Sequence, residues 1–391
     1  MWVTGEVPDR SLGGGNIRQA NLLTEVARHL PVDLLVAGEL TEERCRSSVR
    51  RVIEVPVPER PEPSALTGRL AAMMVLWGRR STLEAHAQLG ARRHLGPALD
   101  ELAPGYDTVL LHHQGLIPLL PRRRDNRWLL HLFHASAVRA RQMAGLAGTT
   151  RQRVVLRREA TNAARLERTV RLADGLVVVA GEDASAIVGD HPVPVIVAPN
   201  GVDLAQYPFT PLPSAPRVVL SASLQYEPNV DGIDWFCREV WPLVRAEVPA
   251  ATLTLVGRDP VASVRARHGH DGIEVHGDVP EMAPFLARAR VAVVPLRIGT
   301  GTRLKVLEAL ASGRPVVGTT IGLAGLGLAD GEEARLADDP QSFAAAVVAL
   351  LRDDAAAERL RLAGRAVVEA RFAWERIGRD LARQLEPTVG R

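Results

Sequence analysis

The sequence predicts an α/β protein with two doubly wound domains, each built on a parallel β-sheet covered by helices. Three observations lead to this fold class. Short apolar runs alternate with longer segments of helical periodicity, a pattern typical of parallel strands joined by crossover helices. A chain of 391 residues, 46% of them hydrophobic, is long enough to bury two cores. A proline-rich stretch divides the pattern into two halves.

The first half contains seven apolar runs of strand length, separated by segments long enough for covering helices. The expected strands are residues 2–4, 32–37, 52–57, 108–112, 128–133, 175–179 and 195–198.

The stretch 199–216, PNGVDLAQYPFTPLPSAP, carries five prolines and no periodicity, which predicts a hinge between two domains. The expected strands beyond it are residues 217–221, 251–256, 272–276, 291–294 and 315–318. We therefore expect a first domain over residues 1–200, a linker over 201–216 and a second domain over 217–371.

Composition and charge exclude several kinds of protein. The net charge is only +3 although the isoelectric point is about 9.3, so charge gives no support for nucleic-acid binding. Cys45 and Cys237 show no CxxC or metal-ligand spacing, which favours small buried thiols in a reducing compartment. The His, Asp and Glu residues form no cluster with metal-ligand spacing, so no bound metal is expected.

No segment has the sequence features of a targeting signal or of a membrane-spanning helix. The opening MWVTGEVPDR gains charge too early for a signal peptide. The longest apolar run, residues 70–78, lies between arginines and falls short of the roughly 18 residues that a spanning helix needs. We expect a cytoplasmic protein, with peripheral membrane contact left open.

Basic residues are concentrated between Arg122 and Arg171, a segment that contains 13 arginines and only 3 acidic residues. The pattern fits a solvated helix face. A patch for an anionic substrate or an anionic membrane surface is the alternative.

Residues 295–310, PLRIGTGTRLKVLEAL, contain the only lysine of the chain, Lys305. The buried strand 291–294 is expected to end in a turn containing Gly299 and Gly301. Thr302 would cap the following helix, which ends at Gly313.

This arrangement would place a helix N-terminus and two cations, Arg303 and Lys305, at the carboxyl edge of a parallel sheet. Doubly wound folds bind ligands at that edge, and a helix N-terminus favours a phosphate. Glu308 could accept hydrogen bonds from a ribose diol. Because a lysine is a compact point charge and an arginine a planar fork, the lone lysine indicates a fitted phosphate contact. Survival by chance is the alternative.

The second half resembles the retaining glycosyltransferases of family 4, the group 1 glycosyl transferases, which have the GT-B fold. The stretches that carry the resemblance are VVLSASLQYEPNVDGIDWF, ATLTLVGRDP, GIEVHGDVPEMAPFLARARVAVVPLRIGTGTRLKVLEALASGRPVV and TTIGLAGL. In the first half, SLGGGNIRQANLLTEVA and LLHLFHAS resemble the Gly-rich first loop and the histidine-bearing strand end of that family. The resemblance implies two Rossmann-like domains facing each other across a cleft, and a last helix within 372–391 that crosses back to the first domain.

The resemblance also implies roles for individual residues. Glu308 matches the glutamate that holds the nucleotide ribose, and His134 the histidine that contacts the donor sugar near the reacting carbon. His134, Arg303 and Lys305 are thereby the expected catalytic residues. The implied nucleotide-sugar site comprises Gly14, Gly15, Gly277, Val279, Thr300, Gly301, Thr302, Arg303, Lys305 and Glu308.

Two departures from the family pattern stand out. Thr300 occupies the position of the first glutamate of the E-x7-E motif, which bears on how the donor sugar is recognised. The loop SASLQYEPN lacks the basic pair that many members use for the pyrophosphate, so Arg303 and Lys305 would supply that charge.

The implied function is metal-independent retaining transfer, of hexosyltransferase type, from a nucleoside-diphosphate sugar to a natural product, glycan or lipid. The sequence does not choose between UDP, GDP and dTDP, and it leaves the oligomeric state open. Its excess of arginine, with many Ala, Gly and Pro residues, is typical of GC-rich coding and suggests an actinobacterial host. A noncatalytic glycosyltransferase-like partner is one alternative. A nucleotide-dependent oxidoreductase is another, although Arg18 stands where GxGxxG needs its third glycine.

Overall fold

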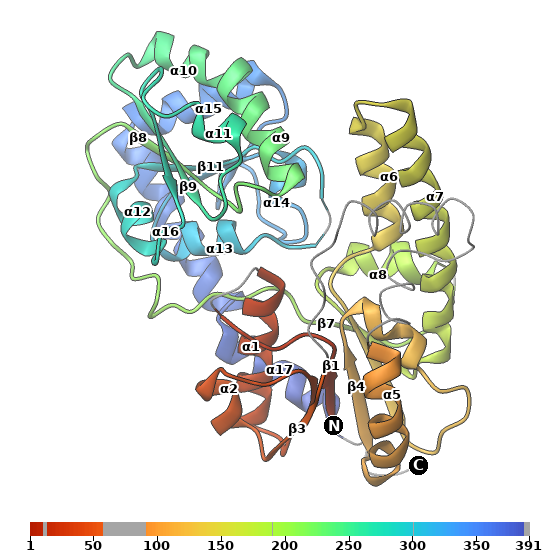
Figure 1. Cartoon of the computed structure of the whole chain (residues 1–391). Coiled ribbons are helices and arrows are strands. Elements are labelled where there is room, and N and C mark those ends of the chain that lie inside the picture. The colour runs from red at the N-terminus through yellow and green to blue at the C-terminus, as the bar shows by residue number, and fades with distance from the viewer. Residues whose placement is uncertain (11–13, 58–90, 190, 300, 387–391) are drawn as a thin grey trace. The chain divides into compact units, whose positions relative to one another are not determined.

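The computed structural model describes residues 1–10, 14–57, 91–189, 191–299 and 301–386. The chain divides into two compact units (Figure 1). One comprises Met1–Pro199 and the chain from Glu375 onward, and the other comprises Asn200–Trp374. Each unit contains one parallel β-sheet with helices around it, as the sequence predicts.

The first unit contains a seven-stranded sheet of order β3-β2-β1-β4-β5-β6-β7, with every neighbouring pair parallel. The order reverses between β1 and β4, the position at which doubly wound sheets open a crevice for ligands. Strands β1, β2 and β6 are buried along their whole length, as expected when helices cover both faces. The strands are β1 Trp2–Thr4, β2 Asp33–Ala37, β3 Arg51–Val55, β4 Thr108–His112, β5 Arg127–Leu132, β6 Gly175–Val178 and β7 Val195–Val197.

Helices connect these strands and close the unit. The pair α6 and α7 runs side by side, and the last helix, α17, lies by α1 (Figure 1). Gly378 permits that approach, since a Cβ there would lie 3.1 Å from the carbonyl carbon of Glu25 on α1. The helices are α1 Gly14–Ala27, α2 Glu43–Ser48, α5 Ala91–Leu102, α6 Ser136–Leu146, α7 Thr150–Glu167, α8 Gly181–Val188 and α17 Trp374–Leu385, with short 3-10 turns at Ala103–Gly105, Gln114–Leu119 and Arg168–Leu172.

The second unit contains a six-stranded parallel sheet of order β10-β9-β8-β11-β12-β13. Here the order reverses between β8 and β11. The strands are β8 Arg217–Ser221, β9 Thr252–Gly257, β10 Ile273–Gly277, β11 Val291–Val294, β12 Val316–Gly318 and β13 Arg335–Leu336. The helices are α9 Glu227–Trp235, a π-turn at Phe236–Val240, α10 Trp241–Glu247, α11 Ala262–Arg265, α12 Ala283–Arg288, α13 Leu304–Ala311, α14 Thr320–Leu323, α15 Pro340–Arg352 and α16 Asp354–Arg371.

The proline-rich stretch packs onto the second unit. Val202 pairs with Ala373 and Tyr207 is buried. The buried guanidinium of Arg314 donates to the carbonyl oxygens of Thr210 (2.6 Å) and Pro211 (3.1 Å). These bonds satisfy backbone carbonyls in a segment where five prolines remove N–H donors.

All twelve predicted strands are present, with ends within two residues of the predicted ones. The sequence missed β13, because a two-residue strand is too short to show a periodic pattern. Cys45 and Cys237 are buried free thiols, as expected. Within the described ranges, no helix is long and apolar enough to cross a membrane. The apolar run 70–78 lies outside the described residues.

Candidate functional site

The segment between β11 and α13 lies beside the point where the second sheet reverses its strand order. Gly299 and Gly301 adopt φ angles of 141° and 75°, a region that favours glycine. Helix α13 then begins at Leu304, with Arg303 in the N-cap position and no side-chain cap. The expectation that Thr302 caps this helix is therefore wrong.

Thr302 instead fastens the loop to the PNGVD stretch. Its hydroxyl accepts from the backbone N–H of Asn200 (3.1 Å), and its carbonyl accepts from the Asn200 side-chain amide (2.8 Å). The side chain is buried. Thr302 thus holds the loop in place, while the N-cap residue Arg303 makes no side-chain cap to α13.

Arg303 supports the same loop. Its guanidinium donates to the carbonyl oxygens of Gly301 (3.1 Å) and Ile321 (3.5 Å). The second contact links the loop to α14. Thr300 lies outside the described residues.

Lys305 lies in the first turn of α13, and its amine reaches α9. Its Nζ donates to Oδ1 of Asn229 at 2.8 Å. Burial, and secondarily the positive charge of Arg303, lower the pKa of Lys305 to about 7, while Glu308 acts in the opposite direction. An amine with this pKa has a charge that responds to an incoming anion.

Glu308 lies three residues further along α13, and the Tyr207 hydroxyl donates a hydrogen bond to its carboxylate. Burial raises the pKa of Glu308, against the lowering effects of the Tyr207 hydrogen bond and of Lys305. Burial and the nearby carboxylate also raise the pKa of Tyr207. A half-buried carboxylate fixed on one side by a phenol keeps further lone pairs for a ligand's hydroxyl groups.

Sequence reasoning missed Tyr207 and Asn229 as partners of Glu308 and Lys305. Tyr207 belongs to the proline-rich stretch 199–216, and Asn229 to SASLQYEPN, which is part of a stretch that carries the resemblance. Neither has a spacing that points to α13, since Asn229 is 76 residues from Lys305.

Gly277 and Val279 lie at the carboxyl end of β10, on the same edge of the second sheet. Between them, Asp278 has a φ of 54°, and its carboxylate accepts from the backbone N–H of Asp259 at 2.7 Å. Gly257, at the end of β9, permits an unusually close approach, because a Cβ there would overlap the carbonyl of Ala222 in the β8–α9 loop. The loops along this edge are therefore tightly connected.

His134 belongs to the first unit and lies between the end of β5 and the start of α6. The amide of buried Gln114 lies 3.1 Å from its Nε2 and 3.2 Å from its Nδ1, while Gln114 Oε1 accepts from the Phe133 N–H at 3.2 Å. The guanidinium of Arg139 lies 3.3 Å from Nε2 of His134. The half-buried imidazole is thus held by polar neighbours at the carboxyl end of the sheet.

The start of α6, just after His134, is held by Glu167. This buried carboxylate accepts from the Ala137 N–H at 3.2 Å and from the Ser136 N–H. Burial raises the pKa of Glu167 to about 7, although both hydrogen bonds act to lower it.

Gly14 and Gly15 form the first turn of α1 rather than part of the preceding loop. Both are exposed, and a Cβ on Gly15 would lie 3.4 Å from the Phe133 ring. The third glycine of the run, Gly13, is outside the described residues.

Three other histidines, His112, His113 and His131, lie in or near the core of the first unit. Arg18 NH2 lies 2.8 Å from Nε2 of His131, and Nδ1 of His131 lies 2.8 Å from Nδ1 of His112. Burial lowers the pKa of His112 and His131 well below the ordinary value, and also lowers that of His113. Among the described residues, no group of three or more His, Cys, Asp or Glu side chains could hold a metal ion.

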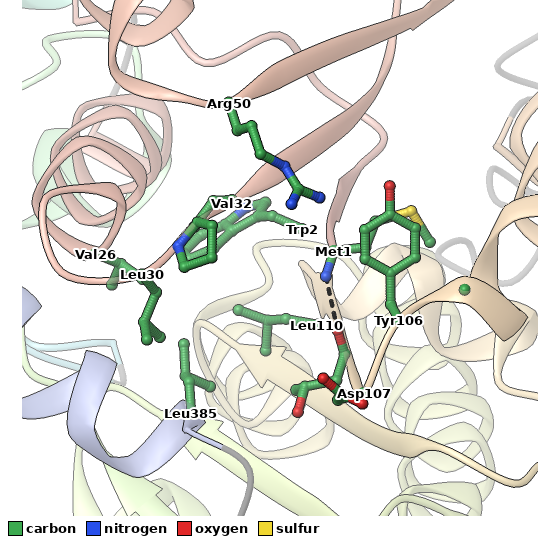
Figure 2. A pocket seen from close by; sticks show the side chains of 13 residues that line it. Met1, Trp2, Val26, Leu30, Val32, Arg50, Tyr106, Asp107, Leu110 and Leu385 are labelled. Carbon is green, nitrogen blue, oxygen red and sulfur yellow. Dashed lines mark hydrogen bonds between the residues drawn. The ribbon is translucent and has the colours of Figure 1, made fainter.

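A cavity of about 260 Å³ lies at the opposite, amino-terminal edge of the first sheet (Figure 2). Val26, Leu30 and Leu385 line it, beside Arg50 and Tyr106. Two polar side chains at its rim are paired with Asp33: Arg50 binds it through two bonds of 2.7 Å, and the Tyr106 hydroxyl donates to it at 2.6 Å. The residues that the family resemblance indicates lie at the carboxyl ends of strands instead, and we place the candidate site there.

Comparison with known proteins shows which family the second unit resembles. Residues 215–353 match the family model of the group 1 glycosyl transferases. This segment therefore resembles a group 1 glycosyltransferase domain. Its segments are similar to a glycogen synthase from Mycobacterium tuberculosis, at 28% identity over 53% of each chain. They are also similar to a phosphatidyl-myo-inositol mannosyltransferase from Mycolicibacterium smegmatis, at 31% identity over 40% of this chain and 42% of the other. The chain thus spans about half the length of the curated relatives it matches.

Solved structures extend the likeness in fold to nearly the whole chain. Sucrose-phosphate synthase from Thermosynechococcus elongatus has a TM-score of 0.70 at 20% identity, covering 98% of this chain and 97% of its own. Anabaena HepE in complex with UDP and glucose has a TM-score of 0.63 at 15% identity, covering 98% of both chains. The fold is therefore GT-B, as the sequence predicts.

Proposed function

We propose that the protein is a retaining glycosyltransferase that transfers a sugar from a nucleoside-diphosphate sugar. The observation that carries the proposal is the contact of Lys305 with Asn229, which spans the strand-order reversal of a group 1 glycosyltransferase domain. Parallel α/β sheets bind their ligands at such a reversal. A half-buried amine there, next to a helix N-terminus, suits a diphosphate.

The proposed roles follow from chemistry and position. Lys305, Arg303 and the first N–H groups of α13 would stabilise the charge that grows on the diphosphate as it leaves. Glu308 would accept from the ribose hydroxyl groups. Gly277 and Val279 would lie against the base. Gly14, Gly15 and His134, on the first unit, would contact the donor's phosphates and sugar.

We propose that the acceptor hydroxyl attacks on the face from which the diphosphate departs, so that the anomeric configuration is retained. A departing phosphate oxygen can take the proton of the attacking hydroxyl, so this route needs no strongly nucleophilic side chain. We also propose that transfer needs no bound metal, because the cations of the chain supply the positive charge. Initial rates unchanged by a chelator would support that proposal.

UDP is the first nucleotide to test. Similar solved structures contain UDP or UDP-glucose, among them Anabaena HepE, and a trehalose-6-phosphate structure from Escherichia coli is bound with UDP-2-fluoro glucose. A glycan or a lipid is the first acceptor class, since the curated relatives are named a glycogen synthase and a phosphatidyl-myo-inositol mannosyltransferase. A natural-product acceptor stays open.

The test has two stages. Thermal unfolding with UDP, GDP and dTDP should show stabilisation by one of them, about 2.7 kcal/mol at 100 times its Kd. The corresponding nucleotide sugars are then assayed with candidate acceptors, and the anomeric configuration of the product is read by NMR. An inverted product would contradict retention. Nucleotide binding without hydrolysis or transfer would favour the noncatalytic partner that Thr300 keeps open.

A further inference from the structure

The side chain of Asn229 has a fixed orientation. It is buried, and its amide nitrogen donates to the carbonyl of Ser223 at 2.8 Å. That bond directs the amide oxygen toward α13, where it accepts from Lys305 Nζ at 2.8 Å. Asn229 therefore links the β8–α9 loop to the only lysine of the chain.

The surroundings of the amine contain little compensating negative charge. No carboxylate lies within 4.0 Å of Lys305 Nζ in the part of the chain that the structure describes. The charged groups that act on it are Arg303, which is positive, and Glu308, which is negative and already accepts from Tyr207. The direct hydrogen-bond partner, Asn229, is neutral.

The β8–α9 loop itself has no cation. Residues 221–229, from the last residue of β8 through the loop to the first turn of α9, read SASLQYEPN, with one acidic residue and no basic one. Asn229 directs Lys305 toward this loop from the other side of the strand-order reversal. The loop thus gains, through a tertiary contact, the positive charge that its own sequence lacks.

We propose that Asn229 is a positioning residue that holds the Lys305 amine at the β8–α9 loop in a largely neutral form, so that binding of the donor's diphosphate takes up one proton. This inference rests on the proposed function. It adds that donor binding is linked to pH through a single amine.

The direction of the linkage follows from the charge balance. With a pKa of about 7, the amine is mostly neutral at pH 8. An adjacent diphosphate favours the ammonium form and raises the pKa, so the amine binds a proton when the ligand arrives. Affinity then falls as pH rises above about 7, by up to tenfold per pH unit while the bound amine stays charged. A carboxylate at position 229 would keep the amine charged throughout and remove the linkage.

The experiment is calorimetric titration of the full chain with UDP at pH 8.0, in two buffers of different ionisation enthalpy. A pKa of about 7 predicts uptake of about 0.9 proton per UDP bound. UDP's terminal phosphate, with a pKa of about 6, is already ionised at this pH and contributes little. Lys305→Met should lose the uptake and bind more weakly. Asn229→Asp should also lose the uptake, because its amine is charged before UDP binds.

Asn229→Ser provides a second variant in case the carboxylate opposite the Ser223 carbonyl disturbs folding. It should weaken UDP binding about fivefold to tenfold through loss of the amine's anchor, while keeping the uptake. Glu227→Gln, an exposed change at the first residue of α9, is the matched control and should alter neither quantity by more than about twofold. Thermal unfolding without UDP checks that each variant is folded.

The outcomes separate the two proposals. Absence of binding by UDP, GDP and dTDP to the unmodified chain would overturn the proposed function itself. Binding of UDP without proton uptake, or uptake that persists in Lys305→Met, would overturn the inference and leave the proposed function standing. Uptake that persists in Asn229→Asp would show that Asn229 does not determine the charge of the amine.

Discussion

The Tyr207 hydroxyl donates a hydrogen bond to the Glu308 carboxylate, and so joins the proline-rich stretch to helix α13. Tyr207 is buried, while Glu308 lies half-buried in the candidate site. The bond favours the ionised carboxylate against burial, which acts the other way. A segment that looks like a simple linker in the sequence therefore helps to set the charge and orientation of the proposed ribose ligand.

Tyr207→Phe should weaken nucleotide binding while leaving the ring's packing intact. A hydrogen bond to a charged group contributes about 1.5–3 kcal/mol. We expect its loss to raise the Kd for the nucleotide about tenfold. Tyr106→Phe is the matched control, because it removes a hydroxyl bond to Asp33 in the other unit. Equal affinities for Tyr207→Phe and the unmodified chain would argue against a positioning role.

Glu308→Ala should weaken binding of the nucleotide more than Tyr207→Phe does, since it removes the proposed ribose contact itself. Each hydrogen bond to the diol contributes about 0.5–1.5 kcal/mol net. Titration with UDP and with 2′-deoxyuridine diphosphate, which lacks the 2′-hydroxyl group, should show that the variant binds the two equally well. A variant that still prefers the ribose form would rule out the ribose assignment.

Lys305→Arg should be impaired although charge is conserved. The amine lies 2.8 Å from Asn229 in a tight site, and a planar guanidinium needs more room and directs its donors differently. We expect kcat/KM to fall at least about tenfold, and further in Lys305→Ala, which loses a charge-assisted contact of about 1.5–3 kcal/mol. Arg297→Lys, an exposed exchange of the same kind beside Asp231, serves as control. A fully active Lys305→Arg enzyme would mean that the lysine is not fitted to its place.

His134→Ala should lower kcat more than it raises KM for the donor, because the proposed contact lies at the reacting sugar. Gln114→Ala removes the amide that holds the imidazole and should show a smaller effect of the same kind. His191→Ala, at an exposed position of the same unit, is the control. If only KM changed in His134→Ala, His134 would be a binding group and the catalytic assignment would be wrong.

Glu167 predicts how stability depends on pH. Its pKa of about 7 in the folded chain lies above the ordinary value of 4.5, so the folded state binds the extra proton between these values. Stability should therefore fall as pH rises from about 4.5 to about 7, by roughly 3 kcal/mol. Denaturant unfolding at several pH values should show this loss in the unmodified chain and not in Glu167→Gln. Glu101→Gln, at an exposed position, should follow the unmodified chain.

The strands of the two sheets could be predicted from the sequence, because strands buried on both faces must be apolar along their length. Runs such as 108–112 and 291–294 therefore mark their own positions, and helices must fill the intervals between parallel strands. The N-terminal cap of α13 could not be predicted in this way. Thr302 has the chemistry of an N-cap, but its hydroxyl accepts from Asn200, a partner 102 residues away that no local pattern reveals.

The two-domain α/β architecture, the family resemblance and the residue types of the candidate site can all be predicted from local pattern and short motifs. Which side chains share an environment is known only from the folded chain. Asn229 at Lys305, Tyr207 at Glu308 and Gln114 at His134 are pairs distant in sequence or on different elements. Charge state and orientation depend on burial and on the nearest partner, both of which arise only when the sheet brings the ends of its strands together.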